Sequence, residues 1–445
     1  MNNLYGINVS DFSAEMADTV HIPSCPEDVI NLIKNSNGKL RVVSTGYNWG
    51  LGSASSKIKS SLLCLKNLNK IREINLNDGY AIIEPGVTQE QLSEALKGSE
   101  RFLNCTASSP FSSIVGNMMD RGVGLHGQRT EDLYGLEVVL GDGTFGSVGW
   151  WPCAKRTSIN PLGLGASSLH LFTQSDLGIV TAAVVRLRPI PSKREILSLN
   201  VDANSISFLV EKIKILTINS VISGVTKIYD GSSSEIYGAN EDKTVLHFCL
   251  DGFEKMIDLK KRIILEELTE INPEVISAEK IEQDPLISAV HNLYHGNVNL
   301  SESIIENTLG VSSEQVDEKG KGWIFILPFV QLNGDDIKTA LSLVKSHRTF
   351  DEVKIGTTIN VLDDKNIDLV IAISFERLPE TIKRAHQCFN SLVAGLTKSG
   401  YLPYRVDSSH TKHDYSINNY GIDFILADRI KECLDPNHVI MNNKY

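Results

Sequence analysis

Residues 40–52 read LRVVSTGYNWGLG, a short apolar run that leads directly into a turn containing three glycines. The apolar part, Leu40–Val43, predicts a buried strand, and Ser44–Gly52 predicts a loop of small residues after it. Successive backbone N–H groups in such a loop can point toward an anion, so the loop is suited to a diphosphate. An ordinary glycine-rich turn is the alternative interpretation. The spacing matches neither GxGxxG nor a P-loop, which excludes the two commonest phosphate-binding folds.

Two further stretches combine small and polar residues in the same way. Residues 112–124 read SSIVGNMMDRGVG, and residues 174–181 read QSDLGIVT ahead of a β-branched strand. Small residues let a backbone approach a flat ligand closely, and Asn117 or Arg121 has the donors to hydrogen-bond its heteroatoms. Each stretch alone is also compatible with an ordinary loop.

The segments around these loops predict a first domain rich in β-structure. Ser24 is the expected N-cap of a helix that starts near Pro26. Thr88 and Gln91 have the spacing of a capping box at a second helix start. Hairpins are predicted from Ile71–Leu76 with Tyr80–Glu84 and from Leu136–Leu140 with Thr144–Val148, and a further β-rich run covers Gly178–Leu187.

After Pro191 the pattern changes to two similar β-α-β-β-α series, at residues 196–268 and 323–398. Their order predicts an α+β fold with one antiparallel sheet and helices on a single face. Residues 271–321 between them are the least readable part of the chain. We therefore expect one domain at residues 1–195, a second at 196–400, and a segment at 401–445 that returns to the first.

Composition excludes several classes of protein. The 445 residues carry 43 basic and 54 acidic side chains, a formal charge of −11, so we expect binding to neither nucleic acid nor anionic membranes. The opening residues resemble no signal peptide and no apolar run is long enough to span a bilayer, which predicts a cytoplasmic protein. Seven scattered cysteines without CxxC spacing predict neither disulfides nor a metal site.

Together, the three loops resemble the vanillyl-alcohol oxidase / p-cresol methylhydroxylase flavoproteins, and in particular their 4-phenol-oxidising branch. The similar segments are VVSTGYNWGLGSAS, IIEPGVTQEQL, SSIVGNMMDRGVG, GLEVVLGDGTF, LFTQSDLGIVT, KSGYLPYR and LDPNHVI. The resemblance implies a PCMH-type FAD-binding domain and a cap domain that covers the flavin ring and forms the substrate cavity.

The resemblance also implies which residues bind FAD. The diphosphate would lie at the glycine-rich loop, the ribityl chain and ring along residues 113–124, and the adenosine near the remaining positions. The implied residues are Ser44, Thr45, Gly46, Tyr47, Asn48, Gly50, Pro85, Gly86, Val87, Ser113, Gly116, Asn117, Asp120, Gly122, Gly124, Ile179, Val180 and Thr181. Covalent attachment is not expected, because residues 357–366 contain neither histidine nor tyrosine and the first loop offers only Tyr47 and Asn48 at the alternative position.

For catalysis, the resemblance implies that Tyr404 and Arg405 contact the substrate's phenolate. A fixed guanidinium stabilises an oxyanion that forms as hydride leaves, whereas a surface arginine at a strand end is the alternative. The family's catalytic aspartate is not matched, because the chain is about two residues shorter after Gly124 and Gln128 falls nearest its place. The base is then lost or supplied by Asp132, Glu131 or His126, with His291, His295 and His410 as further candidates.

These features predict an FAD-dependent oxidase or dehydrogenase that removes hydride from a C–H bond of a small aromatic, alcohol or amine substrate. Oxygen or another acceptor would reoxidise the flavin. A flavin-fold protein with a decayed site that acts as a binding partner is the alternative, and a nicotinamide-dependent reductase ranks below both. The oligomeric state is left open, and a homodimer is the commonest assembly among soluble oligomers. Cap aromatics, among them Tyr229, Tyr237, Tyr294, Trp323, Phe325 and Phe329, either line the cavity or fill the core.

Overall fold

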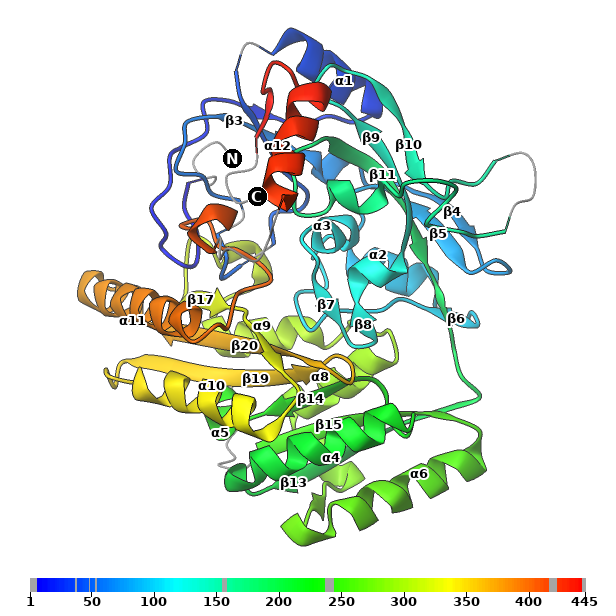
Figure 1. Cartoon of the computed structure of the whole chain (residues 1–445), viewed down its shortest axis with the longest axis vertical. Helices are drawn as coiled ribbons and strands as arrows, with labels where there is room; N and C mark the ends of the chain where they lie inside the picture. The colour runs from blue at the N-terminus through cyan, green and yellow to red at the C-terminus, as the bar shows by residue number, and fades with distance from the viewer. Residues whose placement is uncertain are drawn as a thin grey trace.

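The computed structural model describes residues 6–36, 38–47, 49–52, 54–153, 158–236, 244–415 and 422–441. Figure 1 shows two parts, with the N-terminal half above and a large sheet with its helices below. The small sheet of the upper part has the order β1-β3-β2-β21, with parallel pairing throughout. Its strands are β1 (Val20–His21), β3 (Ser61–Cys64), β2 (Leu40–Val43) and β21 (Ile440–Met441).

Helix α1 (Pro26–Asn35) packs beside this sheet through Val29 and Ile33, which lie one turn apart on its buried face. Its N-cap is Cys25 and not Ser24, so that prediction was wrong by one residue. The Ser24 N–H instead donates to the Asp28 carboxylate at 2.9 Å, which places an acidic side chain in the first helical turn.

The second sheet of the upper part is antiparallel, with the order β10-β9-β11-β5-β4. Both predicted hairpins are confirmed within it. Helix α2 (Gln89–Ala95) begins with the predicted capping box of Thr88 and Gln91. The strands are β4 (Ile71–Asn75), β5 (Tyr80–Ile83), β9 (Leu133–Val139), β10 (Phe145–Gly149) and β11 (Ile179–Arg186).

Helix α3 (Ile114–Met119) lies between these two sheets and the lower part of the molecule (Figure 1). Its first turn is fixed by Ser113, whose hydroxyl accepts a hydrogen bond from the Gly116 N–H at 2.8 Å. Two short ribbons complete the upper part. They are β7 (Val123–Gly124) with β8 (Gly127–Gln128), and β6 (Arg101–Phe102) with β12 (Arg188–Pro189).

The lower part, the cap, is one sheet with the order β16-β13-β15-β14-β19-β20-β17, and β18 also pairs with β20. All its pairings are antiparallel, and its two halves mirror each other about the β14-β19 pair. The predicted pair of β-α-β-β-α series is therefore confirmed. The strands are β13 (Lys193–Val201), β14 (Ser223–Tyr229), β15 (Thr244–Gly252), β16 (Glu274–Val275), β17 (Gly322–Ile326), β18 (Phe329–Gln331), β19 (Val353–Val361) and β20 (Asn366–Phe375).

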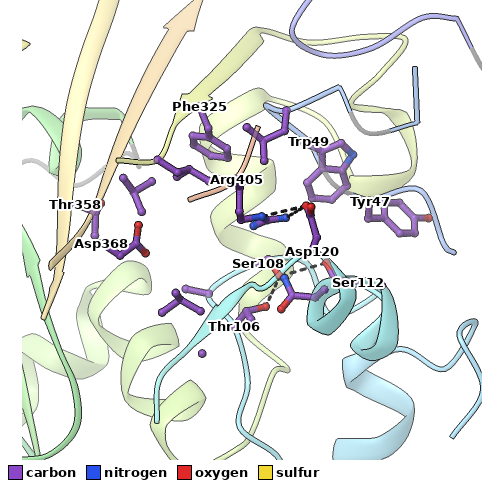
Figure 2. Close-up of a pocket in the computed structure, with 18 of the residues that line it drawn as sticks. Tyr47, Trp49, Thr106, Ser108, Ser112, Asp120, Phe325, Thr358, Asp368 and Arg405 are labelled. Atoms are coloured by element: carbon purple, nitrogen blue, oxygen red, sulfur yellow. Dashed lines mark hydrogen bonds and ion pairs between the residues drawn. The ribbon is translucent and has the colours of Figure 1, made fainter. Parts of the chain in front are cut away.

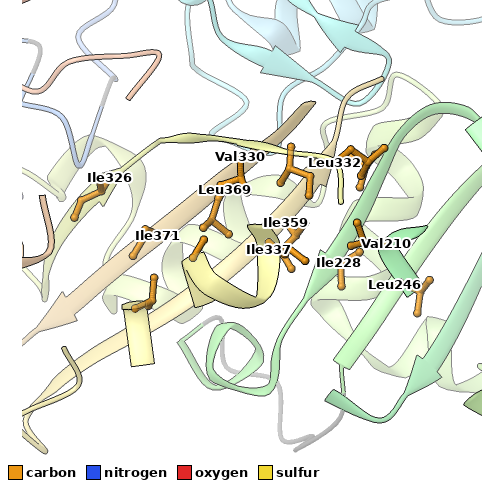
Figure 3. Packing of buried hydrophobic residues seen from close by; sticks show 14 of the residues in the cluster. Val210, Ile228, Leu246, Ile326, Val330, Leu332, Ile337, Ile359, Leu369 and Ile371 are labelled. Atoms are coloured by element: carbon orange, nitrogen blue, oxygen red, sulfur yellow. The ribbon is translucent and has the colours of Figure 1, made fainter. Parts of the chain in front are cut away.

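One face of the cap sheet is covered by α4 (Ile206–Ile218), α6 (Glu254–Glu267), α10 (Gly334–Ser346) and α11 (Pro379–Lys398). Every second residue of the strands meets these helices, as period-two alternation requires. Figure 3 shows this apolar core, in which Val210, Ile228 and Ile337 interdigitate with Ile359 and Leu369. Burial of this apolar surface is the main stabilising term of the cap.

The opposite face of the sheet carries helices that the sequence pattern did not predict. Residues 271–321 form α7 (Ala278–Gln283), α8 (Pro285–Tyr294) and α9 (Ser301–Leu309), and Ile287 of α8 packs on Val245 of β15. Helices therefore lie on both faces, and the prediction of a single covered face was wrong. The remaining helix of the cap is α5 (Gly231–Ile236).

The C-terminal segment runs back along the upper part of the molecule. Its helix α12 (Asp423–Leu434) contributes Ile430 and Leu434 to the apolar cluster of the upper part. Strand β21 then adds to β2 as the edge of the small sheet. None of the helices in the described ranges is long and apolar enough to cross a lipid bilayer.

Candidate active site

A cavity of about 340 Å³ lies between the upper part and the cap. One side is formed by residues 43–47, 106–108 and 112–125, and the other by strands β14, β17, β19 and β20 with Tyr404 and Arg405. Figure 2 shows aromatic and charged side chains from both sides pointing into this space. The cavity therefore brings together loops that are far apart in the sequence.

The glycine-rich loop forms one wall. Gly46 adopts a left-handed backbone (φ +85°) and faces open space, a conformation that glycine adopts without a steric penalty. The Ser113 N–H donates to the Thr45 hydroxyl at 3.1 Å, which ties this loop to α3. A Cβ on Gly116 would overlap the Ser44 hydroxyl, so only glycine allows the loop and helix to meet this closely.

A second cavity continues from the first around α3. Ser44, Gly116 and Asp120 line both, and Pro85, Ile179 and Val180 line the second. The two together make an elongated space beside exposed backbone and small side chains. The Asn117 Oδ1 atom faces this region, buried and without a hydrogen-bond partner among the described residues. An extended dinucleotide with ring N–H donors fits these features, so the residues present suit FAD.

The predicted FAD-binding residues divide into two groups. Those that line the central cavity are Ser44, Thr45, Gly46, Tyr47, Ser113, Gly116, Asn117, Asp120 and Gly124. Pro85, Ile179 and Val180 line only the second cavity. Gly50, Gly86, Val87, Gly122 and Thr181 are not among the described residues of either lining, and Asn48 lies outside the described residues.

Contacts inside the protein explain the non-lining glycines. A Cβ on Gly50 would overlap the ring of Phe325 in β17, and one on Gly122 would overlap Asn117. A Cβ on Gly86 would overlap the Lys66 carbonyl. Glycine is therefore required at these positions because other parts of the chain pack closely against them, and not because a ligand approaches them.

Tyr404 and Arg405, which the resemblance implies as the residues that contact the substrate's phenolate, both line the cavity. The Arg405 Nε donates to the Asp120 carboxylate at 3.0 Å, and the guanidinium makes a second contact with the same oxygen (Figure 2). The Tyr404 carbonyl accepts a bond from Gln174 Nε2 at 2.7 Å, and its ring stacks on Phe329 with centroids 4.6 Å apart. Burial, and then the charge of Asp368, raises the pKa of the Tyr404 hydroxyl, which keeps it a proton donor at neutral pH.

The cap adds three polar residues to the cavity that the sequence analysis missed. The Lys227 Nζ donates to Asn360 Oδ1 at 2.9 Å, and Asn360 Nδ2 donates to the Asp368 carboxylate at 3.0 Å. Burial raises the pKa of Asp368 to about 6 and lowers that of Lys227 to about 8, and the opposite charge of each opposes the shift of the other. Asp368 within the apolar strand IDLVIAI was the signal that could have identified this cluster.

His126 and Asp132, predicted as alternative bases, lie outside the cavity lining. The His126 Nε2 contacts the Tyr294 carbonyl at 2.9 Å, and its ring packs edge-on against Phe102. Asp132 forms an ion pair with Arg188 at 2.9 Å and accepts a bond from Asn104 at 3.0 Å. Both side chains therefore stabilise the packing beneath β8, and neither faces the space where a substrate would bind.

The other histidine candidates also lie away from the described lining residues. His410 contacts Asp407 at 2.9 Å, and His291 contacts Ser198 at 2.7 Å. Among the cap aromatics, Tyr229, Trp323 and Phe325 line the cavity, whereas Tyr294 is fully buried in the core. Phe329 supports Tyr404 from behind, and Tyr237 lies outside the described residues.

Comparisons with known proteins agree with this geometry. Residues 17–149 match the family described as FAD binding domain. The chain is 26% identical to 1'-carboxy-chondrochloren decarboxylase of Chondromyces crocatus over 94% of its length and 88% of that protein. It is 25% identical to the 4-cresol dehydrogenase [hydroxylating] flavoprotein subunit of Pseudomonas putida, over 93% and 84% of the two chains.

A solved structure of p-cresol methylhydroxylase with substrate bound has the same two-part fold. Its TM-score is 0.88 at 23% identity, over 99% of this chain and 91% of that one. The matched FAD domain covers the glycine-rich loop and α3, and the similarity in fold extends through the cap. Residues 17–149 therefore belong to the FAD binding domain family, and the whole chain has the fold of p-cresol methylhydroxylase, so the predicted resemblance to the PCMH-type flavoproteins is confirmed and the protein is an FAD-dependent enzyme of the oxidase and dehydrogenase kind.

Proposed function

We propose that this enzyme oxidises a small substrate that carries an ionisable hydroxyl group, by removing hydride from a C–H bond that is adjacent to the hydroxyl or conjugated with it through an aromatic ring. The bound flavin supplies the redox chemistry, taking the hydride and passing electrons to oxygen or another acceptor. One observation carries the proposal. Arg405, held by Asp120, presents a fixed cationic group to the cavity, and the amine of Lys227 lies on the cavity wall opposite the FAD loops.

The position of Arg405 supports this choice of substrate. Its guanidinium is fixed by the carboxylate on α3, so no reorganisation is needed when negative charge develops on the substrate oxygen. Tyr404, beside it, has a raised pKa and donates a hydrogen bond to that oxygen. A phenol or a benzylic alcohol suits an aromatic-lined cavity of this kind, with Trp323 and Phe325 as the apolar walls.

The test is anaerobic reduction of the FAD-loaded protein. The pure protein, mixed with 4-cresol and then with other 4-alkylphenols and benzylic alcohols, is followed at the visible flavin bands. Bleaching at a substrate-dependent rate supports the proposal. A flavin that dithionite reduces but that none of these compounds bleaches rejects it.

We further propose that FAD is held without a covalent bond. No histidine or cysteine is among the described residues that line the two cavities, and residues 357–366 lack both histidine and tyrosine. Precipitation with trichloroacetic acid should therefore release the yellow colour into the supernatant. A coloured pellet would contradict the assignment.

Removal of a carboxyl group is a second candidate activity. The relative from Chondromyces crocatus is named as a decarboxylase, and two cations in one cavity, Arg405 and Lys227, can bind a carboxylate. Headspace carbon dioxide, measured with hydroxyphenylacetate- and phenylpropanoate-type acids, decides between the two activities. A cytoplasmic location and a homodimer remain predictions, which fractionation and light scattering test.

A further inference from the structure

Five polar residues lie directly opposite one another across five neighbouring strands of the cap sheet. Asp368 pairs with Asn360, Asn360 with Lys227, Lys227 with His247, and His247 with Ser198. All five side chains point to the face opposite the apolar core, and each is buried. We call Asp368, Asn360, Lys227, His247 and Ser198 the polar row.

The polar row begins in the cavity and ends near the surface. Asp368, Asn360 and Lys227 line the cavity. At the other end the Ser198 hydroxyl lies 2.8 Å from His247 Nδ1 and 2.7 Å from His291 Nε2. His291 belongs to α8 and is half-buried. A hydroxyl between two imidazoles accepts from one ring and donates to the other, so these three groups form a continuous hydrogen-bonded chain.

One link of the polar row is open. The His247 Nε2 atom is fully buried and has no hydrogen-bond partner among the described residues. Lys227 is its direct cross-strand neighbour, and the Tyr229 ring lies beside both, 5.1 Å from Lys227 Nζ and 6.0 Å from the His247 ring. An unpaired buried nitrogen is costly, and one bridging water that bonds to Lys227 and His247 would satisfy it.

We propose that Lys227, His247, Ser198 and His291 form a proton path from the active-site cavity to the surface of the cap. The proposal rests on the proposed function, because oxidation of a hydroxylated substrate releases one proton together with the hydride. The path assigns Lys227 as the group that accepts this proton, and the remaining three as positioning residues that pass it on.

The substrate O–H bond breaks, its proton bonds to the unprotonated Lys227 Nζ, and the O–H electron pair stays on the oxygen as the new π bond forms. The electron pair of the C–H bond leaves as hydride, which bound FAD would accept. Lys227 then gives a proton through the bridging water to His247 Nε2. His247 releases its Nδ1 proton to Ser198 Oγ, Ser198 passes its own proton to His291 Nε2, and His291 releases one to solvent. One proton leaves the cavity and each group of the path returns to its starting charge, while the negative charge of the hydride would remain on the reduced cofactor.

The charges around the path suit such a transfer. Burial, and then the proximity of His291 and Lys227, lowers the pKa of His247. Burial, and then the proximity of His295, lowers the pKa of His291 to about 4, so both rings rest neutral and do not trap a proton. Lys227, with a pKa of about 8, is partly unprotonated near neutral pH. Other polar and charged groups face the path along its length. Tyr229, Asn360 and Asp368 lie beside Lys227. Tyr404 and Arg405 lie beside Asp368, and His295 lies beside His291.

The first test uses three variants of the FAD-loaded protein and anaerobic reduction by 4-cresol in a stopped-flow instrument. Ser198→Ala breaks the chain, Ser198→Thr keeps the hydroxyl, and Thr226→Val changes a buried hydroxyl on the other face of the same sheet. The reduction rate should fall by about a factor of ten in Ser198→Ala, with a larger solvent deuterium isotope effect. Ser198→Thr should recover most of it, and Thr226→Val should match the wild type. An unchanged rate in Ser198→Ala overturns the path.

The second test needs no turnover. In protein labelled with nitrogen-15 histidine, NMR should find His247 neutral with its proton on Nδ1, and that proton should exchange with bulk water about tenfold more slowly in Ser198→Ala. Equal exchange in the two proteins overturns the path. If 4-cresol leaves the flavin oxidised while the exchange slows as expected, the proposed substrate class fails and the path stands.

Discussion

At the scale of single residues, the guanidinium of Arg405 is shared between a protein carboxylate and the cavity. Its contact with Asp120 joins the segment after the cap to α3, so the side chain is both fixed and close to the FAD loops. The effects of the position and of the charge of Arg405 can be tested separately, because a lysine at this site keeps the positive charge but loses the two-point contact with Asp120.

Arg405→Ala should lower kcat/KM for the oxidised substrate by a factor of about 100 or more, because oxyanion stabilisation of this type is worth several kcal/mol. The visible flavin spectrum should stay nearly unchanged. Arg405→Lys, the matched control, should recover only part of the loss. Steady-state kinetics with the substrate found by flavin bleaching, together with absorbance spectra, measure both effects. A variant with wild-type kcat/KM would remove Arg405 from the site.

Asp368 predicts a pH dependence of stability. Its pKa in the folded protein is about 6, above its ordinary value of 3.8, because burial disfavours the carboxylate. The folded state therefore binds the Asp368 proton more tightly than the unfolded state does. The protonated carboxyl stabilises the fold below about pH 4, and this stabilisation is lost as pH rises from about 4 to 6.

Asp368→Asn should remove this loss, so the variant should gain stability relative to the wild type over that interval, by at most about 3 kcal/mol. Urea denaturation of the apoprotein between pH 4 and 6.5 measures the difference. Asp258→Asn on the exposed face of α6 is the matched control and should follow the wild type. Parallel pH curves for Asp368→Asn and the wild type would contradict the prediction.

At the scale of elements, the glycine-rich loop is fixed to the cap as well as to α3. The Phe325 N–H donates to the Gly50 carbonyl at 2.9 Å, and the Phe325 ring fills the position that a Gly50 side chain would take. The loop therefore positions the cap against the FAD domain, in addition to its proposed contact with FAD.

Gly50→Ala should destabilise the protein by about 1 kcal/mol through its left-handed backbone and by a further 1–3 kcal/mol through overlap with Phe325. Gly98→Ala isolates the first effect, because Gly98 has φ +76° and no atom within 4 Å of its added Cβ. Thermal unfolding of the two variants measures the difference. The prediction fails if both variants melt at the same temperature.

Sequence patterns predicted the helices and hairpins whose signals lie within a few neighbouring residues. The capping box of Thr88 and Gln91 and the hairpin turn at Asn77–Gly79 need only a few neighbouring residues. Helix α8 was missed although Asp284 caps it through the Leu286 and Ile287 N–H groups and Pro285 begins it. That signal was present, but the helix is apolar on several sides because it is buried between the two parts.

The polar cluster of Asp368, Asn360 and Lys227 in the cavity was harder to predict for a physical reason. Asp368 and Lys227 meet through strand register, between segments whose separation along the chain no local pattern spans. Register depends on how whole strands bury their apolar faces, so a single polar position gives no indication of its partner. Tyr404 and Arg405 were identified only through resemblance, since their motif shows no local signal of chemistry.

At the scale of the whole molecule, the apolar core of the FAD part extends into the cap through α8. The cap has its own core, whereas the core of the FAD part also includes Leu293 and Tyr294 of α8 and Tyr229 of the cap sheet. The two parts are therefore joined by shared burial as well as by the chain. This junction holds the cavity walls together, which the proposed hydride transfer requires.

A second junction is made by Lys431, which joins the C-terminal segment at Asp435 and Ile440 to the distant residue Asp176. Its Nζ donates to the Asp176 carbonyl, to the Asp435 carboxylate and to the Ile440 carbonyl, each within 2.8 Å. Asp435 is fully buried and also accepts from the Val439 and Ile440 N–H groups. Ile440 and Met441 then line the second cavity, so this clasp positions part of the proposed FAD site.

Lys431→Met should leave the Asp435 carboxylate buried without its cation, a loss of about 3–5 kcal/mol. The displaced β21 should also weaken FAD binding, because Ile440 and Met441 would no longer face Ile179 and Val180. The double variant Lys431→Met with Asp435→Asn removes both charges and should recover part of the stability. Thermal unfolding and titration of the apoprotein with FAD measure the two effects. A single variant that melts with the wild type, or a double variant less stable than the single one, would show that the clasp does not depend on this charge pair.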